Sequence, residues 1–295
     1  MPRHFSGSSR GPQGPLFSVG LGRVVPWSVS DPSSIVHLRP KKAFGQNFLV
    51  NERAISTVVA AALASQAGRL LEIGPGPGVL TEHLLVDGRP LWAVDLDPEA
   101  CDLLTMRFAE HAHFHLLQGD AVRIPLPEGR PWSVVGNLPY NAATPILTRF
   151  LLEPLPWDRM VFMFQLEVGQ KILGNPGTKE FGPLSVLSQL CCKVTRLMKL
   201  GPGSFRPAPK VDSVVLLFEP RPDAPDYATR SALLVLLHRS FAHRRKTLAN
   251  NWQGYLSAEQ TVAILASLNL PGQIRAEAVP VGSWLELLRR VNPSL

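Results

Sequence analysis

From residue 51 onward, the chain alternates between segments with helical spacing of apolar residues and short apolar runs typical of buried strands. Asn51 is a suitable N-cap for a helix ending near Ala62, Pro98 suits the first turn of a helix over 98–110, and a short helix is expected from Val79. The expected strands lie at 70–73, 91–95, 114–118, 133–137, 160–165, 193–200 and 212–219. This alternation predicts an α/β fold with a largely parallel sheet and helices on both faces.

The strand pattern stops after Pro220, and the remaining sequence has only helical periodicity. The expected helices there lie at 227–241, 244–252, 258–268 and 281–291. We therefore predict an α/β domain over residues 38–220 and a small helical domain over residues 221–295.

Residues 1–37 differ from the rest because Gly, Pro and Ser dominate them, and Asp31 is their single acidic residue. Such a segment buries too little apolar surface to offset its ordering entropy, so we expect a flexible tail. An organelle transit peptide is the alternative, since the segment carries Arg and Ser and almost no acid. The expected location is therefore the cytoplasm, or an organelle if this segment is a transit peptide.

Composition narrows the classes of protein further. The 295 residues include 30 Lys and Arg against 23 Asp and Glu, a formal net charge of +7 that suggests a polyanionic partner. A hydrophobic content of 45% excludes a wholly disordered chain, and the longest apolar runs are too short to cross a bilayer. Three cysteines without a C-x-x-C pair support neither a zinc site nor a disulfide framework, which fits a reducing compartment.

A glycine loop follows the first expected strand. Glu72 precedes Gly74, Gly76 and Gly78 in a G-x-G-x-G arrangement, which differs from the dinucleotide fingerprint G-x-G-x-x-G and from the Walker motif. A loop of this form with a preceding acid is expected for S-adenosylmethionine (SAM), which has no pyrophosphate to bind at the helix.

Two acidic residues at strand ends strengthen this interpretation. Asp95 ends the second strand, where a carboxylate can accept both ribose hydroxyls of a nucleoside. Asp120 follows the third strand and is placed to accept the adenine amino group. Each feature alone is compatible with a tight turn or a helix cap, but their order and spacing together predict a SAM site.

Asn137, Leu138, Pro139 and Tyr140 follow the fourth expected strand, at the edge where α/β sheets bind ligands. The exocyclic nitrogen of adenine is a poor nucleophile because its lone pair is delocalised into the ring. The amide oxygen of Asn137 and the backbone carbonyl of Leu138 can each accept one amino hydrogen, which frees the lone pair for a methyl donor. Pro139 stiffens the turn, and Tyr140 offers a face to an unstacked base.

With the glycine loop, the acids at strand ends and the tetrapeptide 137–140, the chain resembles the ribosomal RNA adenine dimethyltransferases over residues 39–291. The resemblance is carried by six segments in the order of that family: KKAFGQNFLV (41–50), LEIGPGPGVLTEHL (71–84), QGDA (118–121), GNLPYNAATPIL (136–147), FRPAPKVDSVVL (205–216) and FAHRRKTLANN (241–251). It implies a Rossmann-like class I SAM-dependent methyltransferase fold with a small C-terminal helical domain.

The resemblance also implies an activity and its residues. The enzyme would place two methyl groups on each of two adjacent adenosines in a hairpin near the 3′ end of small-subunit (16S) ribosomal RNA. Tyr140 would stack on the target adenine. The residues contacting SAM or lying beside it would be Asn47, Leu49, Gly74, Gly76, Asp95, Asp120 and Asn137. The implied partner is the small ribosomal subunit or its precursor, and we expect a monomer.

Two departures and three alternatives accompany the resemblance. Leu166 stands where we expect a basic residue, and the N-terminal tail is longer than the family needs. Large-subunit ribosomal RNA methylases of the erythromycin-resistance type share the same tetrapeptide, and DNA adenine methyltransferases usually carry a second proline where Leu138 stands. A non-catalytic ribosome-assembly factor is the alternative from a different class.

Basic residues in three regions are candidates for RNA phosphate contacts. A charge run is usually only a solvated face, but an RNA substrate makes a phosphate-binding surface a sensible prediction. The expected RNA-binding residues are Lys41, Lys42, Arg206, Lys210, Arg244, Arg245 and Lys246, with the last three at the start of a helix.

We expect no metal ion in the chemistry. The sulfonium of SAM is already an activated methyl donor. His111, His113 and His115 lack the spacing of metal ligands on a helix, lie before a strand and are interpreted as exposed loop.

Overall fold

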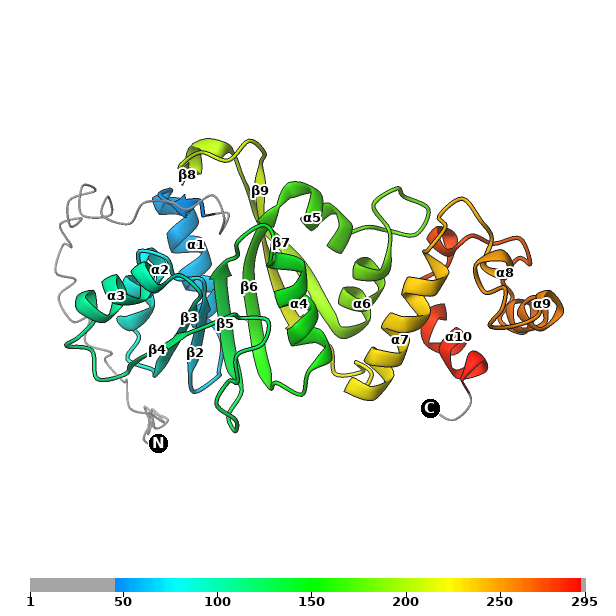
Figure 1. Cartoon of the computed structure of the whole chain (residues 1–295), viewed down its shortest axis with the longest axis horizontal. Coiled ribbons are helices and arrows are strands. Elements are labelled where there is room, and N and C mark those ends of the chain that lie inside the picture. Colours follow the sequence, from blue (N-terminus) through cyan, green and yellow to red (C-terminus); the bar gives the residue numbers. More distant parts are fainter. Residues whose placement is uncertain (1–45, 293–295) are drawn as a thin grey trace, which may run out of the picture. The chain divides into compact units, whose positions relative to one another are not determined.

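In a computed structural model of the chain, which describes residues 46–292, a seven-stranded sheet lies between two layers of helices (Figure 1). Its strand order is β4-β3-β2-β5-β6-β9-β7. The strands are β2 (Leu70–Ile73), β3 (Leu91–Asp95), β4 (Phe114–Gln118), β5 (Trp132–Asn137), β6 (Trp157–Gln165), β7 (Cys192–Leu200) and β9 (Ser213–Pro220). The predicted α/β fold is confirmed.

The sheet is parallel from β4 to β6 and antiparallel beyond it. Strands β4, β3, β2, β5 and β6 pair in parallel, whereas β9 runs antiparallel to both β6 and β7. The parallel strands therefore bring their carboxyl ends to one edge of the sheet, which is where polar residues following each strand meet.

Helices cover the two faces of the sheet in two groups. Helices α1 (Glu52–Leu63), α2 (Val79–Leu85) and α3 (Pro98–Arg107) pack their apolar residues into one core cluster. Helices α4 (Ala143–Leu152), α5 (Leu166–Ile172) and α6 (Pro183–Cys191) pack into a second cluster on the other face. The helices of this second group were not predicted from the sequence.

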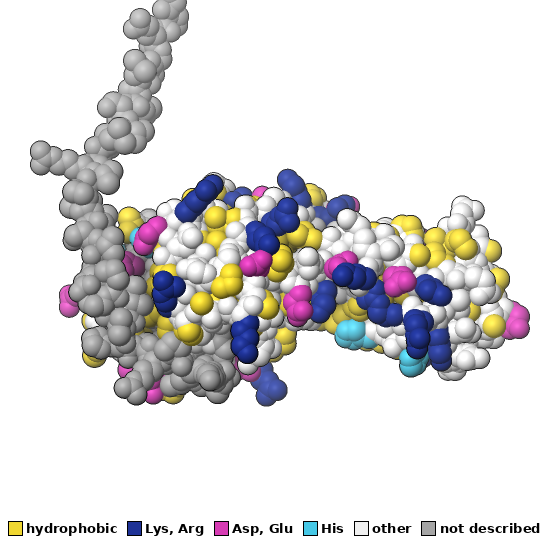
Figure 2. Space-filling model, turned by 90° about the horizontal axis from the view of Figure 1, so that it is seen from above, with side chains coloured by type: hydrophobic (Ala, Val, Ile, Leu, Met, Phe, Trp, Pro, Cys, Tyr) yellow, Lys and Arg dark blue, Asp and Glu magenta, His cyan; other side chains and the backbone are white. Residues whose placement is uncertain are grey.

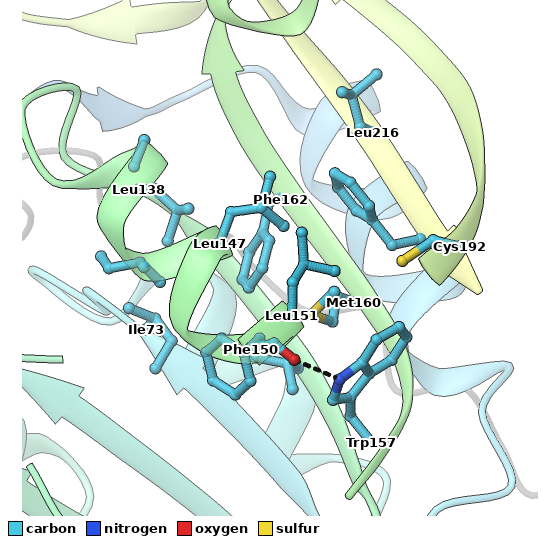
Figure 3. Close-up of a cluster of buried hydrophobic side chains, with 14 of the residues drawn as sticks. Ile73, Leu138, Leu147, Phe150, Leu151, Trp157, Met160, Phe162, Cys192 and Leu216 are labelled. Atoms are coloured by element: carbon cyan, nitrogen blue, oxygen red, sulfur yellow. Dashed lines mark hydrogen bonds between the residues drawn. The ribbon is translucent and has the colours of Figure 1, made fainter. Parts of the chain in front are cut away.

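Figure 3 shows part of the cluster beneath α4, where Leu138 from the predicted site points into the core with Phe162. The indole Nε1 of Trp157 donates to the backbone carbonyl of Phe150 at 3.0 Å, which satisfies the polar atom of a buried ring. Because the Leu138 side chain packs into this cluster, hydrophobic contacts anchor the turn that carries it.

A two-stranded sheet that we did not predict joins distant parts of the chain. β1 (Phe48–Leu49) pairs antiparallel with β8 (Phe205–Arg206), which follows a short 3₁₀ turn η3 (Pro202–Ser204). The backbone N–H of Val50 also donates to the Ser204 carbonyl at 2.9 Å. These bonds fix the segment beginning at Gln46 beside the carboxyl edge of the large sheet.

The C-terminal helices form a core of their own together with α6. They are α7 (Tyr227–Ser240), α8 (Leu248–Asn251), α9 (Ala258–Ser267) and α10 (Ser283–Val291), with a 3₁₀ turn η4 (Ala276–Ala278). Trp252 and Trp284 are buried in this core, which also includes Phe181, Val186 and Leu190 from the region of α6. The helical character of the C-terminal region is confirmed, while the division at residue 220 stays a prediction.

The predicted helix over 244–252 is wrong in its first part and confirmed only over Leu248–Asn251. Residues 241–246 form turns, and α8 starts only at Leu248, after Thr247 caps it by accepting the Asn250 N–H at 3.3 Å. The Asn251 side chain accepts the His243 N–H at 3.1 Å and donates to the carbonyls of His243 and Thr247. These side-chain bonds stabilise the turn in place of a helix.

Two further observations concern membrane-spanning helices and the residues that the structure does not describe. No helix within residues 46–292 is long and apolar enough to cross a membrane. The predicted tail over 1–37, together with Lys41 and Lys42, lies outside the described residues.

Candidate active site

A pocket lies at the carboxyl ends of β4, β3, β2 and β5. It sits between the parallel neighbours β2 and β5, where the order of the strands in the sheet reverses. This is the switch point at which α/β sheets bind ligands. The predicted site residues that line it are Asn47, Gly74, Gly76, Asp95, Asp120, Asn137, Leu138, Pro139 and Tyr140. The structure therefore brings together residues from four strand ends and from the N-terminal segment.

The glycine loop approaches the pocket with its backbone. Gly74 and Gly76 have φ angles of +67° and +54°, a region that favours glycine. A Cβ on Gly76 would lie 2.9 Å from Cε1 of Phe48, so only glycine lets this ring pack against the loop. The loop is thus closed on one side by an aromatic ring from β1.

Asp95 holds the loop as well as facing the pocket. Its Oδ2 accepts the Gly76 N–H at 3.0 Å, and its Oδ1 accepts the Asp97 N–H at 2.9 Å. Burial raises the pKa of the Asp95 carboxyl, while these backbone hydrogen bonds oppose the rise. Each oxygen keeps a further lone pair, so the predicted acceptance of ribose hydroxyls is compatible with these bonds.

Glu72 lies beneath the loop and is almost fully buried. The Thr81 hydroxyl donates to its Oε2 at 2.6 Å. Burial raises the pKa of Glu72 to about 8, and the nearby charge of Asp95 adds to the rise. At neutral pH the raised pKa favours the neutral form of this carboxyl under the glycine loop.

Asp120 begins a single turn after β4. Its Oδ1 accepts the Val122 N–H at 2.9 Å, and its backbone carbonyl accepts the Ile124 N–H at 2.8 Å. Its Oδ2 is 4.0 Å from the exposed guanidinium of Arg123, a solvated contact of little strength. Asp120 thus lines the pocket, and one of its carboxylate oxygens is engaged in its own turn.

The N-terminal segment lines the pocket through residues that sequence reasoning missed. Gln46 Nε2 donates to the buried Asp97 at 3.0 Å, and the ring of Phe48 faces the glycine loop. Leu49, predicted to lie beside SAM, is not a lining residue; its side chain is buried in the core with α1. Alternation along β1 explains the difference, because neighbouring strand residues point to opposite sides.

Asn137 is oriented by the same segment. Its Nδ2 donates to the backbone carbonyl of Asn47 at 2.7 Å, which leaves Oδ1 as an acceptor at the pocket. The neighbouring Leu138 side chain is buried in the core, so its backbone lines the pocket wall. Two oxygen acceptors at this position are what the predicted chemistry on an amino group requires.

Tyr140 is fixed from the other half of the sheet. Its hydroxyl and that of the fully buried Ser213, the first residue of β9, lie 2.9 Å apart in a hydrogen bond. Burial raises the pKa of the Tyr140 phenol, and the bond to Ser213 opposes the rise. The half-buried ring is therefore anchored at its hydroxyl end on the pocket wall.

Basic residues predicted to bind RNA differ in their partners. Arg244 pairs with Glu277 at 3.1 Å, and the Arg206 guanidinium donates to the Phe205 carbonyl at 3.0 Å. Lys210, Arg245 and Lys246 are exposed and have no ion pair within the described part of the chain. In Figure 2, Lys and Arg side chains are spread over the face seen from above, including the C-terminal helices at the right.

The prediction that His111, His113 and His115 lie in an exposed loop is wrong for His115. His111 and His113 are exposed before β4, but His115 lies within β4 and its ring stacks on Trp92 with 4.5 Å between centroids. Among residues 46–292, no group of three or more His, Cys, Asp or Glu side chains is arranged to hold a metal ion.

The parallel sheet, the glycine loop, the acids at strand ends and the pocket between β2 and β5 define a class I SAM-dependent methyltransferase. Residues 37–292 match the family described as "Ribosomal RNA adenine dimethylase". The chain belongs to this family, as its resemblance to the adenine dimethyltransferases predicted.

Relatives and solved structures agree with this assignment. The chain is 39% identical to "Ribosomal RNA small subunit methyltransferase A" of Synechocystis sp. over 270 residues, 84% of this chain and 95% of that protein. Identity to the protein of the same name from Geobacter sulfurreducens is 44%, over 74% of this chain and 81% of that protein.

Among solved structures, a dimethyladenosine transferase from Plasmodium falciparum has a TM-score of 0.71 at 23% identity, covering 83% of this chain and 98% of that one. The 23S rRNA methyltransferase ErmE has a TM-score of 0.64 at 22% identity, covering 83% of this chain and all of the other. At these identities the two structures support the fold alone.

Proposed function

We propose that this protein is a SAM-dependent dimethyltransferase that places two methyl groups on each of two adjacent adenosines in the 3′-terminal hairpin of small-subunit ribosomal RNA. The observation that carries the proposal is the orientation of Asn137, whose amide nitrogen is engaged by Asn47 and whose oxygen is left at the pocket. The names of the relatives point to the small subunit.

The pocket residues fit SAM in the roles expected from the sequence. When bound, SAM supplies a methyl group on a positively charged sulfur. Asp95 is the candidate for the ribose hydroxyls and Asp120 for the adenine amino group, since both residues line the pocket. The loop at Gly74 and Gly76 gives the ligand close access to the backbone.

The chemistry on adenine follows from the acceptors on Asn137 and Leu138. Hydrogen bonds from the amino group to these two oxygens draw the nitrogen out of conjugation and raise the availability of its lone pair. Because the acceptors are fixed before the base arrives, they stabilise developing positive charge on the nitrogen without reorganisation. Tyr140 offers its anchored ring as a stacking surface for the target base.

RNA binding is assigned to the exposed basic residues. Lys210, Arg245 and Lys246 suit phosphate contacts, because no acid within residues 46–292 pairs with them. Arg206 and Arg244 are weaker candidates, since their guanidinium groups already have partners. Lys41 and Lys42 keep the role expected from the sequence. We further propose a precursor of the 30S subunit as the substrate, a monomeric enzyme and a cytoplasmic location.

Mapping the modified nucleotides tests this function. The protein would be incubated with labelled SAM in two parallel reactions. One reaction contains small subunits that lack the methyl groups, and the other contains large subunits. We expect label on two adjacent adenosines near the 3′ end of the small-subunit RNA. Label confined to large-subunit RNA would favour the erythromycin-resistance type of enzyme, and no label on either would favour a non-catalytic assembly factor.

A further inference from the structure

Arg149 is a buried cation that lies outside the predicted site. It sits near the end of α4 with 6% of its side chain exposed. Its Nη1 donates to the Ala121 carbonyl at 2.8 Å, and its Nη2 donates to the Ile124 carbonyl at 2.7 Å. Its Nε donates to Glu153 Oε2 at 2.8 Å. All three nitrogens of the guanidinium are therefore engaged.

The two carbonyls that it binds belong to the turn of Asp120. Residues 120–124 make one turn, closed by the Ile124 N–H on the Asp120 carbonyl and by the Val122 N–H on the Asp120 carboxylate. No further helical turn follows to satisfy the carbonyls at its end. The planar fork of Arg149 binds both at once, a geometry that a lysine ammonium does not reproduce.

The same residue connects this turn to the catalytic loop. Helix α4 starts just after Tyr140, and the Ala142 N–H at its start donates to the Pro139 carbonyl at 2.9 Å. Ile146, one turn before Arg149 on this helix, lines the pocket. One guanidinium therefore links the helix that follows Asn137 to the loop that carries Asp120.

We propose that Arg149 is a positioning residue for cofactor recognition: it holds the turn of Asp120 against α4 so that the Asp120 carboxylate faces the adenine amino group of SAM. The inference rests on the proposed role of Asp120. Arg149 does not itself line the pocket. We infer that it nevertheless helps the pocket to select a purine that carries an amino group.

The test compares two ligands on the full chain. S-adenosylhomocysteine carries the adenine amino group, and its analogue with unsubstituted purine lacks only that group. The ratio of their dissociation constants, measured by calorimetry, reports the amino contact alone. We expect the wild-type protein to prefer adenine by about tenfold or more, the range of a charge-assisted hydrogen bond. Asp120→Ala should bring the ratio close to one, and Arg149→Met should lower it severalfold toward the same value.

Two variants separate positioning from general destabilisation. Arg89 makes the same kind of bonds at the opposite end of β3, donating to the carbonyls of Leu63, Ser65 and Ala67. Arg89→Met should therefore lower the melting temperature and keep the wild-type ratio. Arg149→Lys retains the charge without the fork, so it should also lower the ratio, and it serves if Arg149→Met does not fold.

The outcomes distinguish the two assignments. A reduced ratio in Asp120→Ala with a wild-type ratio in both Arg149 variants would overturn the role of Arg149 alone. A wild-type ratio in Asp120→Ala would overturn the assignment of Asp120 to the adenine amino group, and the inference for Arg149 with it.

Discussion

The side-chain amide of Asn137 donates to the backbone carbonyl of Asn47 at 2.7 Å. This bond joins the turn after β5 to the N-terminal segment, which β8 holds in place through β1. Because the donor is engaged, the Asn137 oxygen is the atom offered to a substrate. The N-terminal segment therefore sets the direction of the group that we expect to activate adenine.

Asn137→Asp tests whether that orientation matters. An aspartate keeps an oxygen at the pocket, but it cannot donate to the Asn47 carbonyl and its charge would face that oxygen. We expect kcat to fall by about a hundredfold or more, in line with the loss of a preorganised transition-state contact. SAM affinity, measured by calorimetry, should change little. A variant with wild-type kcat would show that the bond to Asn47 is dispensable.

Asp95→Ala should weaken SAM binding. A lost charge-assisted bond to the ribose should cost roughly 1.5–3 kcal/mol in binding free energy. The melting temperature should also fall, because the N–H groups of Gly76 and Asp97 lose their acceptor. Asp95→Asn serves as the comparison, since it retains one oxygen. RNA affinity should stay near that of the wild type; unchanged SAM affinity would mean that another residue holds the ribose.

The residues at strand ends were predictable because parallel strands bring their carboxyl ends together. Asp95, Asp120 and Asn137 needed only the strand pattern to be placed at one edge. Gln46, Phe48 and Arg149 were not predictable in this way. Their roles depend on contacts between segments far apart in the sequence, such as the pairing of β1 with β8, for which local periodicity gives no signal.

The error in the first part of the predicted helix over 244–252 has a different cause. Arg and Lys are good helix formers, so the run of basic residues favoured a helix. In the structure, bonds from the Asn251 side chain to the backbone of His243 and Thr247 hold a turn instead. The Lys246 N–H also donates to the His243 carbonyl at 2.9 Å. Together these bonds outweigh helix propensity, and the basic residues are presented from a turn.

Glu72 should make folding stability depend on pH. The folded pKa of about 8 lies above the ordinary value of 4.5, so the folded state holds a proton that the unfolded state releases. The contribution of Glu72 to the free energy of unfolding should therefore be greatest below about pH 4.5 and decline as the pH rises to about 8. The total decline should be on the order of 3–5 kcal/mol. Glu72→Gln stays neutral and keeps an acceptor for Thr81.

The measurement is the difference in unfolding free energy between wild type and Glu72→Gln across this pH range. The variant should gain stability relative to the wild type as the pH rises from 5 to 8. A difference that does not vary with pH would mean that Glu72 is ionised in the folded protein.

Replacing both Arg245 and Lys246 by Ala should weaken RNA binding and flatten its salt dependence. Each lost phosphate contact should reduce the log–log salt slope by roughly 0.7–0.9. Arg289→Ala with Arg290→Ala on α10 removes the same charge elsewhere in the C-terminal region and serves as the control. The salt slope is measured by titrating each variant against small subunits at several salt concentrations. Circular dichroism melting shows whether each variant is still folded. Equal slopes for wild type and the Arg245/Lys246 variant would remove the turn from the RNA surface.

The most direct test of the account is the single-turnover rate of methyl transfer from labelled SAM to undermethylated small subunits, measured for wild type and Asn137→Ala. Asn137 lines the pocket with its amide nitrogen engaged by Asn47, and we propose that its oxygen activates adenine in the transition state. We predict that the wild type modifies two adjacent adenosines and that Asn137→Ala binds SAM and subunits normally but loses most of the rate. An Asn137→Ala enzyme that transfers methyl groups at a near-wild-type rate would contradict the account.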